Sequence, residues 1–382
     1  MTTLTKTPKS AVAKGNGRNI RRTKKKTKIC LSSRTSVGLM LLATVAPIAA
    51  DMVAANLRRP MDVRSQAASQ SPGLVPNFEP EHSLHTGTMT YASLPHPHQD
   101  LVVSGQFNGE LRFWHPQTGE ETFSHLAHTD AIEELAISND GRLVASAGWD
   151  NQISVIDTET QQQLLSLVGH RDDVKAVAIS ADGRLLVSGS FDTTVRGWDL
   201  KTGQQLFSLP HSHSVTALAI SADGETVASG DRRGNIYLWD LGSRNQPQVI
   251  KGHQRTVWDL AISPDGAYLA SGSQDQSILL WDLQQDSPLR RLEGHARAVY
   301  AIDISPDGQT IASGSYDSVV KLWDMATGQL NQTLTGHESA VWSVNFDQTG
   351  KRLVSNSADG EIHTWSAQLM TSQPDRTVSV PE

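Results

Sequence analysis

The chain has 382 residues and a formal net charge of −7, and its composition is that of a soluble globular protein. Residues 1–36 hold eleven of the 33 lysines and arginines and no acid. The remainder has 22 basic against 40 acidic residues, a net charge of −18, and such an acidic body argues against a nucleic-acid partner.

The N-terminal part of the chain predicts export or anchoring. Residues 1–36 are expected to form a basic disordered leader, which is followed by the uncharged run Val37–Ala50 and a mostly apolar stretch to Leu57. A basic flank before an apolar run is typical of a secretory signal, and residues 37–57 are also long enough for an uncleaved membrane anchor, although Pro47 and Asp51 weaken that interpretation. We expect the body to lie on the non-cytoplasmic side, with a cytoplasmic protein as the alternative.

Residues 58–80 are rich in Ser, Gln, Ala and Pro and are expected to form a linker. Cys30, the single cysteine, lies in the leader, so no disulfide can form within the chain. The main domain is expected to span residues 81–366, followed by a tail at 367–382.

The main domain is a tandem repeat. Seven positions recur at intervals of 41 or 42 residues, and six of them hold Trp: Trp114, Ile156, Trp198, Trp239, Trp281, Trp323 and Trp365. Each unit contains four short β-type runs, as in Gln163–Leu167, Val174–Ser180, Leu185–Ser190 and Val195–Asp199, joined by turns rich in Asp, Thr and Gly. Four antiparallel strands cannot bury both faces of their sheet, but seven sheets around one axis can.

Gly-His, Asp-Gly and Trp-Asp elements at this spacing resemble the WD40-repeat family over residues 81–366. The resemblance implies an all-β, seven-bladed β-propeller in which each repeat buries a hydrogen-bonded tetrad of His, Ser, Asp and Trp. Complete tetrads are expected in repeats three, five, six and seven: His170, Ser188, Asp192, Trp198; His253, Ser271, Asp275, Trp281; His295, Ser313, Asp317, Trp323; His337, Ser355, Asp359, Trp365. The other repeats depart from the pattern: Asn108 and a displaced His85 in the first, Ile156 in the second and Arg233 in the fourth.

His, Ser and Asp at fixed spacing also suggest a hydrolase, but a nucleophile occurs once per site and not in seven repeats. His96 and His98 could bind a metal, but two ligands in one turn are weak support. We therefore expect no catalytic residue, no metal and no cofactor.

A functional surface is sought at the positions that vary between repeats. Five residues after each His the repeats hold Thr90, Glu133, Lys175, Thr216, Trp258, Tyr300 and Trp342, and the family places this position on one face near the channel. The residue before the tetrad Asp faces the same way. The predicted partner-binding residues are Trp258, Tyr300, Trp342, Phe107, Trp149, Phe191, Tyr316, Glu133 and Lys175. Each ring could instead merely cap the core.

The sequence thus favours a non-catalytic scaffold that binds a protein or peptide. A binder of small ligands or glycans is the alternative, and a propeller enzyme is a weaker one because fold alone does not exclude it. The last blade needs an outer strand from one terminus, and the family pattern assigns it to Asn77–Leu84, with Thr377–Val380 as the rival.

Overall fold

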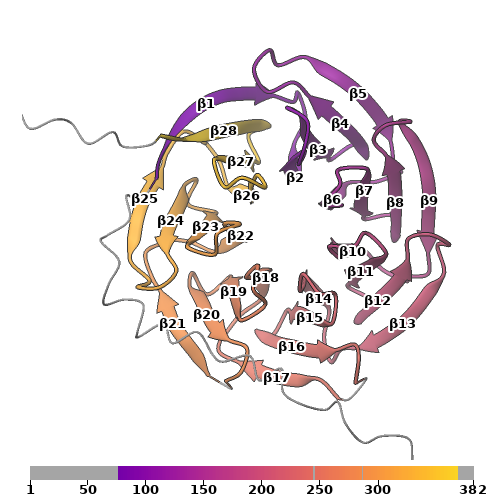
Figure 1. Cartoon of the computed structure of the whole chain (residues 1–382), viewed down its shortest axis with the longest axis vertical. Coiled ribbons are helices and arrows are strands. Elements are labelled where there is room, and N and C mark those ends of the chain that lie inside the picture. Colours follow the sequence, from indigo (N-terminus) through magenta and orange to yellow (C-terminus); the bar gives the residue numbers. More distant parts are fainter. Residues whose placement is uncertain (1–75, 244–245, 286, 369–382) are drawn as a thin grey trace, which may run out of the picture. The chain divides into compact units, whose positions relative to one another are not determined.

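The computed structural model describes residues 76–243, 246–285 and 287–368. Within them it contains 28 β-strands, and no helix there is long and apolar enough to cross a membrane. Seven four-stranded antiparallel sheets surround a central axis (Figure 1), which confirms the predicted propeller. The predicted leader, the hydrophobic segment and residues 369–382 lie outside the described part of the chain.

Each blade is built from strands that follow one another outward from the axis, except that blade 7 takes its outermost strand from the N-terminal side. From blade 1 to blade 7 the innermost strands are β2 (Thr90–Pro95), β6 (Ile132–Ile137), β10 (Val174–Ile179), β14 (Val215–Ile220), β18 (Val257–Ile262), β22 (Val299–Ile304) and β26 (Val341–Phe346). The second strands are β3 (Val102–Gln106), β7 (Leu143–Gly148), β11 (Leu185–Ser190), β15 (Thr226–Asp231), β19 (Tyr268–Ser273), β23 (Thr310–Ser315) and β27 (Arg352–Ser357).

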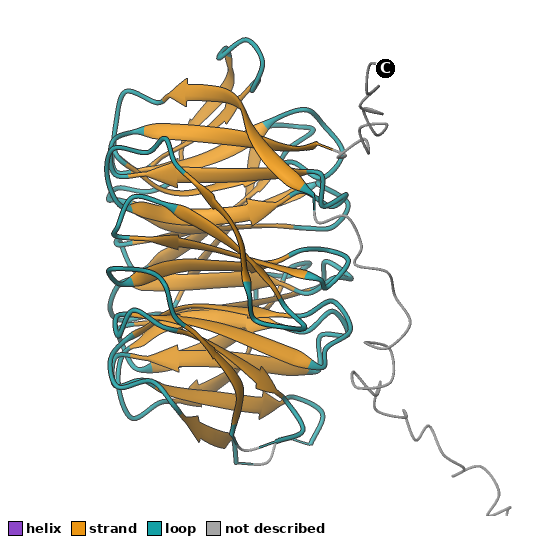
Figure 2. Ribbon diagram, turned by 90° about the vertical axis from the view of Figure 1, so that its left-hand side faces the viewer, coloured by secondary structure: helices purple, strands orange, loops and turns teal. Residues whose placement is uncertain are grey.

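The two remaining strands of each blade lie toward the rim of the ring. The third strands are β4 (Glu110–Trp114), β8 (Gln152–Asp157), β12 (Thr194–Asp199), β16 (Asn235–Asp240), β20 (Ile278–Asp282), β24 (Val320–Asp324) and β28 (Glu361–Gln368). The outermost strands are β5 (Glu121–Leu126), β9 (Gln162–Val168), β13 (Gln205–Pro210), β17 (Gln248–Lys251), β21 (Pro288–Leu292), β25 (Leu330–Leu334) and β1 (Asn77–His85). The connecting loops gather on two opposite faces of the ring (Figure 2).

The turn between the first two strands of blade 3 shows why Asp-Gly recurs. Ser180 Oγ donates to Asp182 Oδ1 at 2.6 Å, and the same carboxylate accepts the backbone N–H of Arg184 at 3.1 Å. Gly183 has a φ of 68°, a left-handed conformation that glycine adopts without steric cost. Local side-chain bonds therefore close the turn before any tertiary contact forms.

The hydrophobic core is divided between the interfaces of neighbouring blades. The cluster between blades 2 and 3, for example, contains Val155 and Leu167 from one sheet and Val177 and Trp198 from the next, all buried. Each sheet thus covers the apolar face of its neighbour, as the repeat requires.

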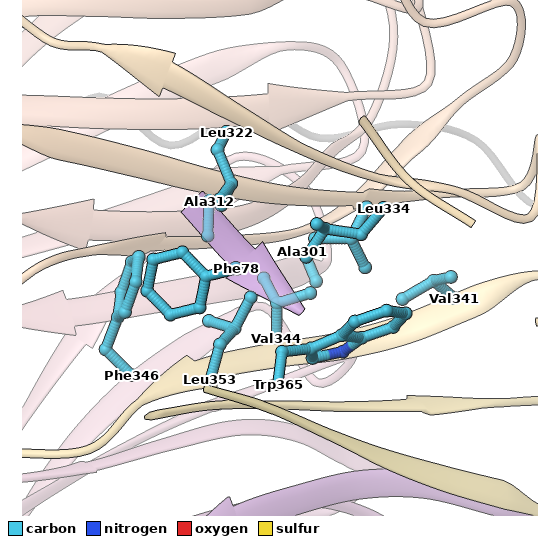
Figure 3. Packing of buried hydrophobic residues seen from close by; sticks show 11 residues of the cluster. Phe78, Ala301, Ala312, Leu322, Leu334, Val341, Val344, Phe346, Leu353 and Trp365 are labelled. Atoms are coloured by element: carbon cyan, nitrogen blue, oxygen red, sulfur yellow. The ribbon is translucent and has the colours of Figure 1, made fainter. Parts of the chain in front are cut away.

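Closure of the ring depends on the N-terminal strand. β1 pairs antiparallel with β28, with a register shift beside Pro80, so the predicted outer strand is confirmed and begins at Asn77, four residues before the expected domain boundary. Phe78 enters the core of blade 7 (Figure 3), where its ring lies 6.0 Å from that of Phe346 in an edge-on arrangement. Gln332 of β25 binds the Phe78 backbone through both its amide atoms, at 2.9 and 2.7 Å.

Substitution Phe78→Ala is expected to lower the free energy of unfolding by about 3 kcal/mol or more, because it empties a buried aromatic site in the closing strand. Urea denaturation of the full chain measures the loss. Glu79→Ala, on the exposed side of the same strand, is the matched control and should stay within about 0.5 kcal/mol of the wild type. Equal stability of Phe78→Ala and wild type would show that β1 does not hold the ring closed.

Candidate functional site

One of the two loop-bearing faces is built by the same contact in every blade. The loop that leads into each innermost strand accepts a backbone hydrogen bond from the turn between the second and third strands of that blade. In blade 2 the Trp149 N–H donates to the Ala131 carbonyl at 2.9 Å, and in blade 5 the Gln274 N–H donates to the Thr256 carbonyl at 2.9 Å. We call this end of the propeller the top face.

A β-bulge near the start of each innermost strand directs one side chain to the top face. In blade 5, Val257 lies opposite Ser273 and Asp259 opposite Gly272, so Trp258 has no residue opposite it. A bulge re-aims the side chain of the extra residue. The same register shift occurs in all seven blades, at Tyr91, Glu133, Lys175, Thr216, Trp258, Tyr300 and Trp342.

The aromatic side chains on the top face touch one another in series. The ring centroids of Trp258 and Tyr300 are 5.2 Å apart, those of Tyr300 and Trp342 4.5 Å, and those of Trp342 and Tyr91 5.5 Å. From Tyr91 the series continues to Trp149 at 5.6 Å, and Phe107 lies 6.2 Å from both. Tyr316 contacts Tyr300 from the outer side at 6.1 Å. These residues together form the aromatic crescent.

Tyr91 is the member that the sequence analysis missed. The prediction that His85 serves as the first repeat's tetrad histidine is wrong: it ends β1, is exposed, and its Nδ1 lies 2.8 Å from Glu361. Thr86 is buried at the tetrad position, so counting from His85 selected the buried Thr90 instead of Tyr91. Counting from the tryptophan finds it, because Tyr91 precedes Trp114 by the same interval that separates Trp258 from Trp281.

Glu133 and Lys175 fix the far end of the crescent. Lys175 is buried, its Nζ lies 2.6 Å from a Glu133 carboxylate oxygen, and it lies over the rings of Trp149 and Phe191 at 4.7 and 5.0 Å. The Trp149 indole N–H donates to Glu133 at 2.5 Å. These two predicted binding residues therefore form an ion pair with each other, and they hold the rings of Trp149 and Phe191 in position.

Below the crescent the channel forms a cavity of about 700 Å³ whose wall carries the carboxyl groups of Glu134, Asp259 and Asp303. Each carboxylate accepts a backbone N–H from the innermost strand of a neighbouring blade: Asp259 from Ile302 and Asp303 from Phe346, both at 2.7 Å. Burial raises the pKa of Asp259 and that of Asp303 to about 7, although these hydrogen bonds act in the opposite direction.

The tetrads of repeats three, five and six have the expected geometry. In blade 3, His170 Nδ1 lies 2.9 Å from Asp192, the Ser188 hydroxyl lies 2.8 Å from His170 Nε2, and the Trp198 indole N–H donates to Ser188 at 2.8 Å. Equivalent contacts of 2.8–3.0 Å join His253, Ser271, Asp275 and Trp281, and His295, Ser313, Asp317 and Trp323. Burial would raise the pKa of Asp317, but the hydrogen bond and charge of His295, together with the hydrogen bonds from Ala296 and Ser315, outweigh burial and lower the pKa to about 2.

The seventh tetrad, predicted to be complete, is stretched. His337 Nδ1 and the nearest Asp359 oxygen are 3.8 Å apart, too far for a hydrogen bond, whereas the Ser355 and Trp365 contacts remain at 2.8 and 2.9 Å. The ring of His363 packs 4.1 Å from that of His337.

In the fourth repeat, which lacks the tetrad Asp, an aromatic ring also packs against the tetrad histidine. There the ring of Tyr237 packs 4.0 Å from that of His211, and burial lowers the pKa of His211 to about 4. In the second repeat His128 still contacts Asp150 and Ser146, at 2.9 and 2.8 Å, without a tryptophan.

The tetrads are unsuited to catalysis. Ser188 is fully buried, and its hydroxyl is already bonded to His170 and Trp198, so it cannot reach a substrate. His96 and His98, the candidate metal ligands, instead connect neighbouring turns, since their Nε2 atoms bond to the carbonyls of Gly141 and Asn139 at 3.0 and 2.9 Å. Within residues 76–368, apart from the short gaps, no group of three or more His, Cys, Asp or Glu side chains could hold a metal ion.

Comparison with known proteins agrees with this architecture. Residues 198–367 match a family described as the WDR3 first beta-propeller domain, and residues 119–157 and 161–199 each match the WD domain, G-beta repeat. A curated relative, eukaryotic translation initiation factor 3 subunit I from Culex quinquefasciatus, is 29% identical over 96 residues. That stretch is 25% of this chain and 28% of the relative, so the match covers well under two thirds of the relative's length.

The tetrad geometries predict unequal effects of removing the aspartate. Asp275→Ala should lower the free energy of unfolding by about 2 kcal/mol, because it leaves the buried His253 without its charged acceptor. Asp359→Ala should cost less, because the His337 contact is already stretched. Urea unfolding of the two variants at the same pH measures the difference, and equal losses would show that the two contacts are equivalent in solution.

Asp303→Asn is expected to change the pH dependence of stability. In the wild type the folded pKa of about 7 lies above the unfolded value, so the stability that neutral Asp303 contributes is full at low pH and is lost as the pH rises through 7. Asn keeps an acceptor for the Phe346 N–H but cannot ionise. The wild type should therefore lose more stability than the variant when urea unfolding is compared at about pH 5.5 and about pH 8.5. Parallel pH profiles would contradict the assignment.

Proposed function

Because the chain belongs to the WD40-repeat β-propeller family, we propose that it is a non-catalytic interaction scaffold whose aromatic crescent binds a protein or peptide partner. The crescent is the observation that carries the proposal. A soluble protein seldom leaves so many rings in contact on one face unless that face is covered by something else.

The rings of the crescent are held in place by their contacts but are not fully buried from solvent. Phe107 and Tyr316 are 49% and 47% exposed, and the rings of Trp258, Tyr300 and Trp342 are partly exposed. Their mutual contacts would also suit a cap over the channel, yet capping alone does not require side chains that remain open to solvent. Large rings that are already ordered lose little rotamer entropy on binding, which is why they dominate the energetics of protein interfaces.

The relative supports a protein partner in general terms, since its name describes a subunit of a translation initiation factor, a component of an assembly. A small ligand such as a glycan is the second candidate, because the cavity of about 700 Å³ opens among the same rings. The two candidates differ in what they would displace: a peptide would cover the crescent, whereas a small ligand would enter the cavity.

Trp258→Ala and Trp342→Ala are each expected to weaken binding of the native partner by about 2 kcal/mol or more, because each removes an anchor at the centre of the face. Proteins that co-purify with the full-length wild type and are lost from both variants are identified. The affinity of the purified pair is then measured by calorimetry.

Trp281→Ala is the control, because Trp281 is fully buried in a tetrad and its loss should damage folding instead. The melting temperature of the two crescent variants should stay close to that of the wild type. Undiminished affinity for every co-purifying protein would show that the crescent is only a cap.

A further inference from the structure

The top face carries an unusual group of arginines on blades 4 to 6. Arg232 and Arg233 lie in the turn between β15 and β16, Arg255 in the loop before β18, and Arg297 in the loop before β22. All four are exposed. We call these four residues the arginine sector.

These arginines have no acidic partner within the described part of the chain, although acids outnumber bases in the whole protein. Most other arginines of the described propeller do form ion pairs, namely Arg112, Arg142, Arg184, Arg196, Arg291 and Arg352, whereas Arg171 and Arg290 on other blades do not. In a body with so many carboxylates, a cluster of unpaired guanidinium groups leaves an uncompensated positive patch. Such a patch attracts a ligand of opposite charge.

The sector and the crescent form one continuous surface. Arg297 lies over the ring of Tyr316 at 5.4 Å, and Tyr316 leads through Tyr300 to Trp258. At the other end Arg232 lies over the ring of Phe191 at 4.3 Å and lines the same channel mouth as Trp258. Guanidinium groups on aromatic faces are held in position while their N–H donors stay available.

A second observation also points to a ligand rich in acceptors. The indole Nε1 atoms of Trp258 and Trp342 are buried and have no hydrogen-bond partner, whereas Trp149 Nε1 donates to Glu133. A buried N–H without an acceptor costs free energy that a bound acceptor would recover. The guanidinium groups of the arginine sector and these two indole N–H groups of the crescent are all hydrogen-bond donors.

Acidic residues are concentrated on the loops that lead into blades 2 and 3, where Asp130, Asp172 and Asp173 accompany a single arginine, Arg171. The charge on the top face therefore changes sign between blade 3 and blade 4, beside the channel mouth that the aromatic crescent lines. This division would orient a charged segment laid across it.

We propose that the partner contributes an acidic peptide segment, whose Asp and Glu carboxylates bind the arginine sector while its apolar side chains cover the crescent. The inference rests on the proposed function and specifies the chemistry of its partner. Carboxylates fit the forked guanidinium donors and accept from the orphaned indole N–H groups.

The test is an unbiased selection of random 12-residue peptides displayed on phage, carried out on the full chain. Selected peptides are synthesised with a fluorescent label, and their affinities are measured by anisotropy. The charge-reversal variant is Arg255→Glu with Arg297→Glu. The matched control, Arg184→Glu with Lys351→Glu, changes the net charge equally but lies in turns between the first and second strands of blades 3 and 7, away from the top face. All variants keep the basic residues 1–36, so peptides that bind there bind every variant alike.

The expected result is enrichment of acidic peptides whose affinity falls at least tenfold in the sector variant and in Trp258→Ala, but is unchanged in the control. Replacing their acids with Lys should restore part of the affinity for the sector variant. Peptides that need Trp258 but are neutral or basic would overturn the acidic-partner inference and leave the proposed function intact. If no selected peptide depends on Trp258 or Trp342, the proposed function itself fails.

Two further probes separate other anions from the acidic peptide. A selected peptide is remade with phosphoserine in place of its acids, and a 12-nucleotide single-stranded polyuridine carries the same label. Binding of the phosphopeptide or of the polyuridine at least tenfold tighter than the acidic peptide, with loss in the sector variant, would overturn the carboxylate assignment. Weaker binding of both supports it.

Discussion

The antiparallel pairing of β1 with β28 joins the first described strand to the last and thereby closes the ring of blades. A four-stranded sheet has two apolar faces and two open edges. One blade alone can neither bury its faces nor protect its edges. With the ring closed, each face is covered by a neighbour. The edges that line the channel are partly satisfied by side chains of the adjacent blade, such as Asp259 and Asp303. Phe78 and Gln332 stabilise the one junction that chain connectivity does not provide.

Repetition separates the residues that serve the fold from those that serve a ligand. The tetrads of blades 3, 5 and 6 use the same four side chains, because a buried polar network that ties a loop to its sheet must have its hydrogen bonds satisfied. The bulged residue of each innermost strand has no residue opposite it in the second strand, and its type varies between blades, from Thr216 to Trp258. The bulge therefore gives each blade one position near the channel mouth that the repeat does not fix.

The period of the repeat was enough to predict the number of blades and the four antiparallel strands of each, since these follow from local turns and a fixed spacing. The tetrads were predicted from the resemblance to the WD40-repeat family. The tetrad histidine of the first repeat was assigned wrongly, because a polar residue, Thr86, replaces the histidine and a surface histidine, His85, precedes it. The stretched His337–Asp359 contact and the ion pair of Lys175 with Glu133 depend on side chains that the fold brings together, which the spacing of the repeat does not encode. Nor could the sequence show which arginines find a carboxylate, because that depends on loops brought together from different repeats.

The unit that repeats in the sequence is not the blade, because the run before each tetrad histidine completes the previous sheet, as β9 completes blade 2 before His170. Neighbouring units are thus interlocked, because each unit contributes one strand to the sheet of the preceding blade. Duplication of one sequence unit in a gene would supply three strands of a new blade and the outermost strand of the preceding blade. A ring can therefore gain a blade only if the new unit packs against both neighbouring blades. That requirement favours rings whose units have matching interfaces. It restricts sequence divergence between the units to positions that do not contact a neighbouring blade.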